Sequence, residues 1–373
     1  MRDPGKVQPA RHGPLKGRGA ASYVAGRFET TATELADDGW GSAADRRDAT
    51  GDADAAPPRL QTEVREERAR SIVSRNDSPD IGFSQSVNPY RGCEHGCVYC
   101  FARPSHAYLD LSPGLDFETR LFAKTNAAEL LRAEFARKGY RCSSIALGIN
   151  TDAYQPIERT HRISRQLLEV MAECGHPATI ITKNAMVLRD LDLLVPMAKA
   201  RLVKVHFSVT TLDNRLAARM EPRASAPHAK LDAIRTLHAA GVPVGIMVAP
   251  VIPMITDHEI EAILEATREA GAGEAGYVLL RLPHELKAIW REWLQLHYPE
   301  RAAHVMSLVR QMRGGKDYDS TFGTRLSGEG PFAQLINTRF RKAYRRLGFG
   351  PLPELDTTRF VPPRPATPQG SLF

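Results

Sequence analysis

Short apolar runs recur along the chain, and a longer stretch with helical periodicity separates each run from the next. The runs are rich in β-branched residues, which favours strands. Because each connection is long enough to return the chain to the same edge, we expect neighbouring strands to be parallel. The expected strands are SVNPY, SIALGI, ATIITK, VKVHFSV, VGIMVAP and YVLLRL, and the expected helices cover about 161–174, 187–200, 225–240, 256–270 and 284–297.

Repeated units of apolar strand and amphipathic helix are typical of two α/β folds, an open doubly wound sheet and an incomplete β/α barrel. In both folds, chemistry gathers at the carboxyl ends of the strands. Polar residues stand at those ends here, so we expect one rim to collect them. They are Asn150, Thr151 and Asp152 after SIALGI, Thr182 and Lys183 at the end of ATIITK, and Ser208 near the end of VKVHFSV.

The chain divides into five parts around this repeat. Residues 84–298 form the expected core, and residues 61–83 form a segment that packs against it. Residues 1–60 show no sustained apolar period and contain Pro57-Pro58, which predicts a disordered extension. Residues 299–350 predict a helical extension, and residues 351–373 a Pro-rich tail without structure.

The composition bears on where the protein acts and on its partners. No run of apolar residues is long enough to span a membrane, and the N-terminus lacks the apolar stretch of a secretory signal, so we expect a cytoplasmic protein without membrane contact. The net charge of +7 and the pI near 9.2 admit an anionic partner such as nucleic acid. Nothing in the sequence specifies an oligomeric state.

The segment NPYRGCEHGCVYCFARP carries three of the five cysteines in the pattern CxxxCxxC, which argues for metal ligation and against a disulfide framework. These are Cys93, Cys97 and Cys100. Three thiolates suit a 4Fe-4S cluster with one iron left open, and neither Cys142 nor Cys174 is an evident fourth ligand. The alternative is a zinc site with His95 or a distant residue as fourth ligand, although the paired CxxC elements of structural zinc folds are absent.

A CxxxCxxC loop after the first strand of six β/α units resembles the radical S-adenosylmethionine (SAM) superfamily. Residues 84–285 resemble more specifically the spore photoproduct lyase-like, or DNA repair photolyase-like, group. The resemblance implies an α/β fold, a partial (β/α)6 barrel of the radical SAM type. The shared motifs follow the family's order: CxYC ending at Cys100, NTD at Asn150–Asp152, TK at Thr182–Lys183, FSV at Phe207–Val209, MEP at Met220–Pro222 and VAPV at Val248–Val251.

The resemblance implies two cofactors, a 4Fe-4S cluster and SAM, with an electron donor such as flavodoxin or ferredoxin. It places Tyr99 next to the adenine, Thr151 and Asp152 on polar groups of the cofactor, Lys183 on its carboxylate, Ser208 on its methionine or ribose part, and Pro250 in an apolar wall for the adenosyl group. The charges of Asp152 and Lys183 agree with this placement, because a zwitterionic cofactor needs an anion near its ammonium group and a cation near its carboxylate.

Two positions depart from spore photoproduct lyase. The cysteine that returns a hydrogen atom in that family is replaced by Ile149, and the tyrosine after the last cluster cysteine is replaced by Phe101. Neither side chain can donate hydrogen in that way. We therefore expect a different reaction from the lyase's repair relay.

Three further features have both a functional and a structural interpretation. Arg103, His106, Tyr108 and Arg120 line a groove for an anionic substrate, or their segment shields the cluster. Glu221 and Arg223 contact a ligand, or they form internal ion pairs. The basic run RFRKAYRR, residues 339–346, binds nucleic acid, or it packs Phe340 and Tyr344 on the body with its arginines in water.

These observations predict a radical SAM enzyme that cleaves SAM at its cluster to make a 5′-deoxyadenosyl radical and acts on nucleic acid. One alternative is a radical SAM enzyme that modifies a protein or a small metabolite. Another is a non-enzymatic metal-binding protein that holds RNA or DNA.

Overall fold

A seven-stranded sheet forms the centre of the computed structural model, which describes residues 15–29 and 60–363. The strand order is β10-β9-β8-β7-β6-β3-β2, and all neighbours pair in parallel except β2, which runs antiparallel to β3. The six parallel strands confirm the partial (β/α)6 barrel. The strands are β2 (Val73–Arg75), β3 (Gln85–Val87), β6 (Ile145–Leu147), β7 (Ala178–Thr182), β8 (Val203–Ser208), β9 (Val244–Val251) and β10 (Glu274–Leu279).

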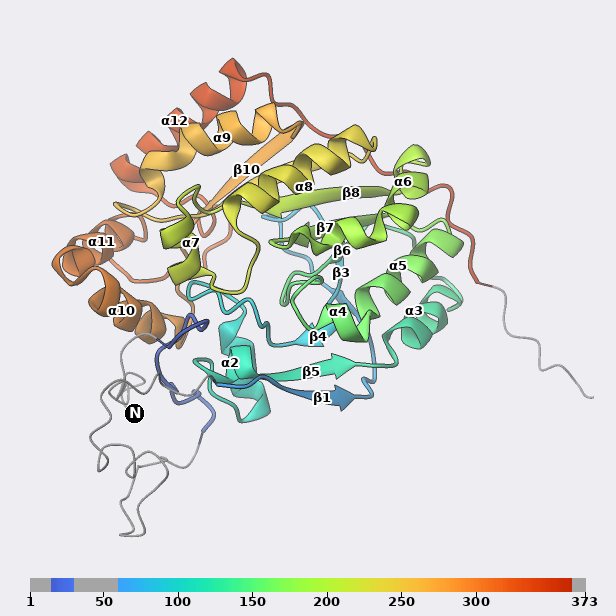
Figure 1. The fold of residues 1–373 in the computed structure, drawn as a ribbon, viewed down its shortest axis with the longest axis horizontal. Coiled ribbons are helices and arrows are strands. Elements are labelled where there is room, and N and C mark those ends of the chain that lie inside the picture. Colours follow the sequence, from blue (N-terminus) through green and yellow to red (C-terminus); the bar gives the residue numbers. More distant parts are fainter. Residues whose placement is uncertain (1–14, 30–59, 364–373) are drawn as a thin grey trace, which may run out of the picture.

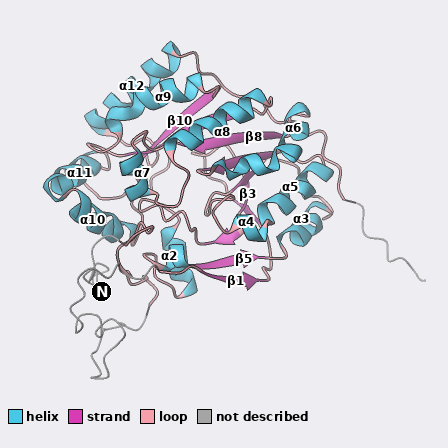
Figure 2. Cartoon of the chain, in the orientation of Figure 1, coloured by secondary structure: helices cyan, strands magenta, loops and turns pink. Residues whose placement is uncertain are grey.

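Helices cover the outer face of this sheet, as Figures 1 and 2 show. Each crossover supplies a helix, and alternate strand residues such as Val203, Val205 and Phe207 are buried against that layer. The intervening residues of β8, Lys204 and His206, are only half-buried on the inner face. The helices between β5 and β10 are α3 (Ala127–Phe135), α4 (Glu158–His161), α5 (Ile163–Glu173), η2 (Ala185–Asp190), α6 (Leu191–Lys199), α7 (Asn214–Met220), α8 (Pro227–Ala239), η3 (Asp257–Glu259) and α9 (Ile260–Glu269).

A second, three-stranded sheet packs beside the barrel and was not expected from the sequence. Its order is β1-β5-β4, with β1 parallel and β4 antiparallel to β5. Because β1 reads EVREE and exposes three of its five residues, it lacks the apolar run by which the other strands were found. The elements here are β1 (Glu63–Glu67), β4 (Tyr90–Arg91), β5 (Arg120–Lys124), η1 (Arg103–Leu109) and α2 (Asp116–Thr119).

Three helices follow the barrel: α10 (Leu286–His297), α11 (Pro299–Gln311) and α12 (Gly330–Arg346). Helix α12 contains the basic run 339–346, and it packs on α9 through the buried ring of Phe340. Two of its arginines pair with glutamates of α9, Arg339 with Glu261 and Arg346 with Glu265. The structural interpretation of this run is therefore the one that the structure supports.

Both terminal regions differ from the expectation of missing structure where they are described. Residues 15–29, here called the strap, pack beside α10 and α2, and Ala20 and Val24 are buried (Figure 1). Residues 351–363 return along the barrel, where the Val361 amide donates to the Cys174 carbonyl. Backbone hydrogen bonds of this kind leave no apolar period in the sequence. The parts of these expectations that concern residues 1–14, 30–59 and 364–373 lie outside the described residues.

An aromatic cluster joins α3, the residues before β7 and the C-terminal segment. The ring of His176 stacks on Phe135 with 4.3 Å between centroids, and Phe360 packs edge-on against both. The Nδ1 atom of His176 lies 3.0 Å from the Pro177 carbonyl, and Nε2 lies 2.8 Å from the Tyr140 hydroxyl. Burial lowers the pKa of His176 to about 4. The folded protein therefore holds this histidine neutral at pH 7.

The buried His176 predicts a measurable loss of stability in weak acid. Because its folded pKa lies below its unfolded value, the unfolded chain binds the extra proton, and stability falls as pH drops from about 6.5 towards 4. We expect His176→Phe to be less stable at pH 7 but to lose about 2 kcal/mol less than wild type between pH 7 and pH 5. Denaturant unfolding at both pH values measures the difference. The exposed His228→Phe variant is the control, and equal slopes for the two variants would contradict the prediction.

Candidate functional site

The three candidate cluster cysteines lie on a loop, residues 92–100, that reaches the carboxyl ends of the strands. Its backbone is bonded to elements on both sides, since the Cys93 amide donates to the Phe117 carbonyl and the Val98 amide to the Met220 carbonyl. Gly96 adopts φ +66°, and a Cβ there would lie 2.3 Å from a carboxylate oxygen of Glu118. Only glycine fits this turn.

The thiols of this loop fit a metal cluster in number and chemistry. Cys93 and Cys97 are buried, and Cys100 is half-buried. Burial, the Asp152 carboxylate and the other two thiols all raise the pKa of Cys93. Burial is also the main reason why the pKa of Cys97 is raised to about 12. Thiolates in this position need positive charge beside them, which the irons of a cluster would supply.

The side chain of Arg103 binds the backbone of the cysteine loop on its buried side. It is fully buried, and its guanidinium donates to the carbonyls of Cys97 at 2.8 Å and Gly96 at 3.0 Å. The same group pairs with the fully buried Glu118 at 2.9 Å. Glu118 also accepts hydrogen bonds from the amides of Gly19 and Ala20 in the strap. One ion pair thus joins the cysteine loop to the strap.

Thr151 and Gln155 hold the front of the loop. The Thr151 hydroxyl donates to the Gly92 carbonyl at 2.6 Å, and the Gln155 amide donates to the Thr151 hydroxyl at 2.8 Å. The Gln155 side-chain oxygen accepts the Glu94 amide at 2.7 Å. Gln155 is fully buried and was missed by sequence reasoning, because a glutamine in a rim loop carries no signal of its own. Thr151 therefore positions the loop.

Asp152 stands at the junction of the loop and β7. Its carboxylate accepts hydrogen bonds from the Thr182 hydroxyl and the Lys183 amide, each at 2.7 Å, and faces Nδ1 of His95 at 3.3 Å. Burial alone would raise the pKa of Asp152, but these partners lower it to about 2. The other ring nitrogen of His95 faces Asn184 at 3.2 Å. Both ring nitrogens thus have protein partners, which leaves neither for the zinc alternative.

Tyr99 and Glu221 form a second buried group on the other side of the loop. The Tyr99 hydroxyl donates to the Glu221 carboxylate and lies 3.0 Å from the Thr210 hydroxyl. Glu221 pairs with the fully buried Lys230 at 2.6 Å. Although burial would raise the pKa of Glu221, Lys230 and Lys183 lower it. The ion-pair interpretation of Glu221 is therefore correct, and the same holds for Arg223, which pairs with Glu94.

Lys183 lies at the centre of the predicted site. Its ammonium stands 5.9 Å from the centre of the Tyr99 ring, and none of the hydrogen bonds within residues 15–29 and 60–363 involves it. Burial opposes its charge, but the thiol of Cys97 and the carboxylate of Glu221 outweigh burial and raise its pKa. In the register of β7 and β8, Thr182 pairs with Phe207, so Lys183 comes level with Ser208.

The remaining predicted cofactor residue, Pro250, lies on the neighbouring strand β9 and is buried. The preceding carbonyl, of Ala249, accepts the Thr210 hydroxyl at 3.0 Å, and Thr210 in turn contacts Tyr99. The structure therefore brings the predicted residues to one rim, although Thr151 and Asp152 direct their polar atoms into protein hydrogen bonds.

The segment after the cysteines shields the loop more than it forms a groove. Arg103 and His106 are fully buried, and Nε2 of His106 faces the Arg120 carbonyl at 3.0 Å. Tyr108 is 71% exposed, and the Arg120 side chain is half exposed beside Asp116. Two of the four residues are thus unable to meet a substrate.

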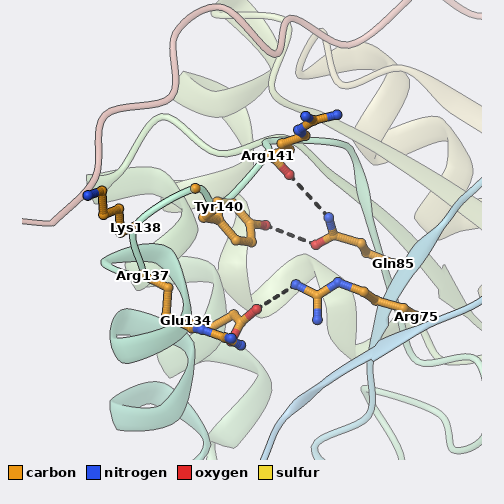
Figure 3. Close-up of a pocket in the computed structure, with 8 residues that line it drawn as sticks. Arg75, Gln85, Glu134, Arg137, Lys138, Tyr140 and Arg141 are labelled. Carbon is orange, nitrogen blue, oxygen red and sulfur yellow. Dashed lines mark hydrogen bonds and ion pairs between the residues drawn. The ribbon is translucent and has the colours of Figure 1, made fainter.

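A cavity of about 290 Å³ lies at the opposite ends of the strands (Figure 3). Gln85, which begins β3, lines it together with the basic side chains of Arg75, Arg137, Lys138 and Arg141. Figure 3 shows the link from Arg75 to Glu134, a 2.5 Å ion pair. This cavity contains none of the predicted site residues.

Comparison with known proteins identifies the family. The Radical SAM superfamily domain matches residues 87–267, a stretch that contains all three cysteines. The chain belongs to the radical SAM superfamily. Enzymes of this superfamily use a 4Fe-4S cluster and SAM, so a 4Fe-4S cluster and SAM are the cofactors of this radical SAM protein. Such enzymes also need a reductant as electron donor.

Its relatives share sequence over most of the core. An uncharacterized protein of Mycobacterium tuberculosis is 37% identical over 233 residues, covering 62% of this chain and 68% of that protein. One from Methanocaldococcus jannaschii is 26% identical over 220 residues, covering 59% and 78%. Spore photoproduct lyase complexed with dinucleoside spore photoproduct has the same fold, with a TM-score of 0.54 and 16% identity over 77% of this chain and 80% of that one. Among the described residues of this radical SAM protein, no helix is apolar and long enough to cross a membrane.

Arg103 gives a test of how the loop is held. In Arg103→Lys, one ammonium replaces the planar fork, so the Gly96 and Cys97 carbonyls lose donors while the charge beside Glu118 remains. We expect a lower iron content after reconstitution and a loss of about 2 to 4 kcal/mol in unfolding free energy. Iron and sulfide assays with denaturant unfolding measure both. Arg120→Lys is the exposed control, and wild-type iron content in Arg103→Lys would refute the role.

Proposed function

We propose that this radical SAM enzyme holds its 4Fe-4S cluster on Cys93, Cys97 and Cys100, cleaves SAM there and acts on a nucleic acid substrate. The observation that carries the proposal is the set of three thiols beside one ammonium, Lys183, that lacks a carboxylate partner within 4 Å among the described residues. When bound, the cluster and SAM supply a 5′-deoxyadenosyl radical that abstracts hydrogen.

The side chains of the rim divide into binding and positioning groups under this proposal. Lys183 attracts the carboxylate of SAM, and Ser208 offers a hydroxyl beside it. Tyr99 and Pro250 form an apolar wall for the adenosyl group. Thr151 and Asp152 keep these groups in place through the loop, β7 and the backbone of Lys183. A rim fixed by buried hydrogen bonds also keeps stray hydrogen donors away from a radical.

Two observations favour nucleic acid as the substrate class. The chain carries a net charge of +7, which attracts polyanions. A structure of the same fold, spore photoproduct lyase, is complexed with a dinucleoside spore photoproduct. Flavodoxin or ferredoxin is the proposed electron donor. The lyase's own reaction is not proposed, because Ile149 and Phe101 stand where its hydrogen-donating groups are expected.

Removal of one thiol tests the cluster assignment. Cys97→Ala should lose the absorbance of the thiolate-to-iron bands and form no 5′-deoxyadenosine above background, because two thiolates cannot hold three irons of the cluster. The assay combines anaerobic reconstitution, SAM and a strong reductant. Cys142→Ala, outside the loop, should retain both signals. Cys97→Ala with wild-type turnover would show that the ligands lie elsewhere, and a colourless zinc-loaded wild type would refute the radical enzyme.

The missing hydrogen donors predict a negative result with the lyase's substrate. The reconstituted protein should cleave SAM but should not reverse dinucleoside spore photoproduct at a rate near that of spore photoproduct lyase, because an aliphatic side chain at position 149 donates no hydrogen. Chromatography of the thymine products, with the lyase itself as positive control, measures the reversal. A rate comparable with the lyase's would overturn this part of the proposal.

A further inference from the structure

The loop between α11 and α12, residues 312–329, contacts the end of β10 and carries the aromatic side chains of Tyr318 and Phe322. The Leu279 amide donates to the Leu326 carbonyl at 2.9 Å. Arg313, which is 2% exposed, donates to the carbonyls of Leu280 on one side and Thr324 and Arg325 on the other, at 2.8 to 3.0 Å. The loop is therefore fixed to the barrel by buried hydrogen bonds.

Arg281, just after β10, connects this loop to the cysteine loop. Its guanidinium carbon lies 5.5 Å from the ring centre of Phe101 and 5.9 Å from that of Tyr318, and it donates to the Tyr318 hydroxyl at 3.3 Å. Phe101 directly follows Cys100. The aromatic ring that replaces the lyase's tyrosine thus serves as a face for an arginine.

The charge of Arg281 is unmatched in the described part of the chain. Neither Arg281 nor Arg313 forms an ion pair there, and the Nε atoms of both are buried without an acceptor. Burial and the nearby charge of Arg281 lower the pKa of Arg313 to about 10, so the two cations lie close enough to repel each other. Arg281 itself is only half-buried, and its Nη1 atom forms no hydrogen bond among the described residues, so this nitrogen can donate to an oxygen of an anion.

One exposed aromatic ring lies beside Arg281, and a second lies on the same loop as Tyr318. Phe101 is 43% exposed and Phe322 is 56% exposed, although both are large apolar side chains. The guanidinium carbon of Arg325 lies 4.6 Å from the Phe322 ring centre and holds that ring in place, while its charge is paired with Asp80. Alternation of arginine and open aromatic faces is the arrangement that binds phosphates and stacks bases of single-stranded nucleic acids.

We propose that Arg281, between Phe101 and Tyr318, binds a phosphate of a single-stranded nucleic acid substrate, and that the open faces of Phe101 and Phe322 stack on its bases. This assignment rests on the proposed function and moves nucleic acid recognition from α12, whose Arg339 and Arg346 are paired with glutamates, to the loop that touches the cysteine loop.

Anisotropy of a fluorescein-labelled single-stranded oligodeoxynucleotide, titrated with the reconstituted holoenzyme over a salt series, tests the assignment. Arg281→Gln should weaken binding about tenfold and reduce the salt slope by about 0.7, the value for one phosphate contact on a single strand. Phe322→Ala should weaken binding about fivefold with an unchanged slope, because stacking releases no counterions. Arg346→Gln removes the same charge from α12 and should match wild type.

Iron content and thermal midpoint of each variant establish that the protein is folded and loaded. Should Arg281→Gln fold poorly, Phe322→Ala and Arg346→Gln still decide the matter, because both residues are on the surface. Wild-type binding by Arg281→Gln, or equal losses in Arg281→Gln and Arg346→Gln, would overturn the assignment and leave the proposed function standing. A wild-type protein that shows no salt-dependent binding would overturn nucleic acid as the substrate class, and the assignment with it.

Discussion

The buried guanidinium of Arg103 supports the geometry of the whole site. A loop that presents three thiols within eight positions leaves its own carbonyls without helix or sheet partners, and Arg103 supplies the missing donors to Gly96 and Cys97. The charge brought into the interior is balanced by Glu118. Loss of either member of such a pair costs about 3 to 5 kcal/mol, because the other is left buried and uncompensated. The cysteine loop is therefore held in place by buried protein groups.

The carboxylates of the rim are committed to protein partners. Asp152 is saturated by Thr182, His95 and the Lys183 backbone, and Glu221 by Tyr99 and Lys230. The ammonium of Lys183 is thus left as a cation without a carboxylate within ion-pair distance among the described residues of the rim. Under the proposed function, these fixed dipoles and the one available charge would favour the carboxylate end of SAM.

The sequence was most informative where burial is periodic. Parallel strands covered by helices consist of apolar runs, so β6 to β10 were predicted from that pattern. Strand β1 was not predicted, because four of its five residues are charged and it lies at the edge of its sheet. The spacing of the three cysteines singled out the loop, and their role as cluster ligands stays a prediction. The hydrogen bonds of Thr151, Asp152 and Glu221 could not be predicted from the sequence. The same residue types serve in rim residues that bind a cofactor and in rim residues that hold a loop in place. Packing of the strap depends on a glycine, since a Cβ at Gly19 would lie 1.8 Å from the Gly96 carbonyl oxygen, and no hydrophobicity pattern records such a contact.

The strap also imposes an order on how the chain is assembled. Residues 15–29 are synthesised long before α10, yet Ser22 bonds to Glu292 and Arg27 to Glu285, both of which belong to or adjoin α10. The contacts of Ser22 and Arg27 therefore form only after residues 285–292 have been synthesised, whereas the barrel strands can pair as they emerge. Gly19 and Ala20, which cover one side of the cysteine loop, bond to Glu118 and not to α10. The two halves of the strap thus depend on segments of the chain that are synthesised far apart in time.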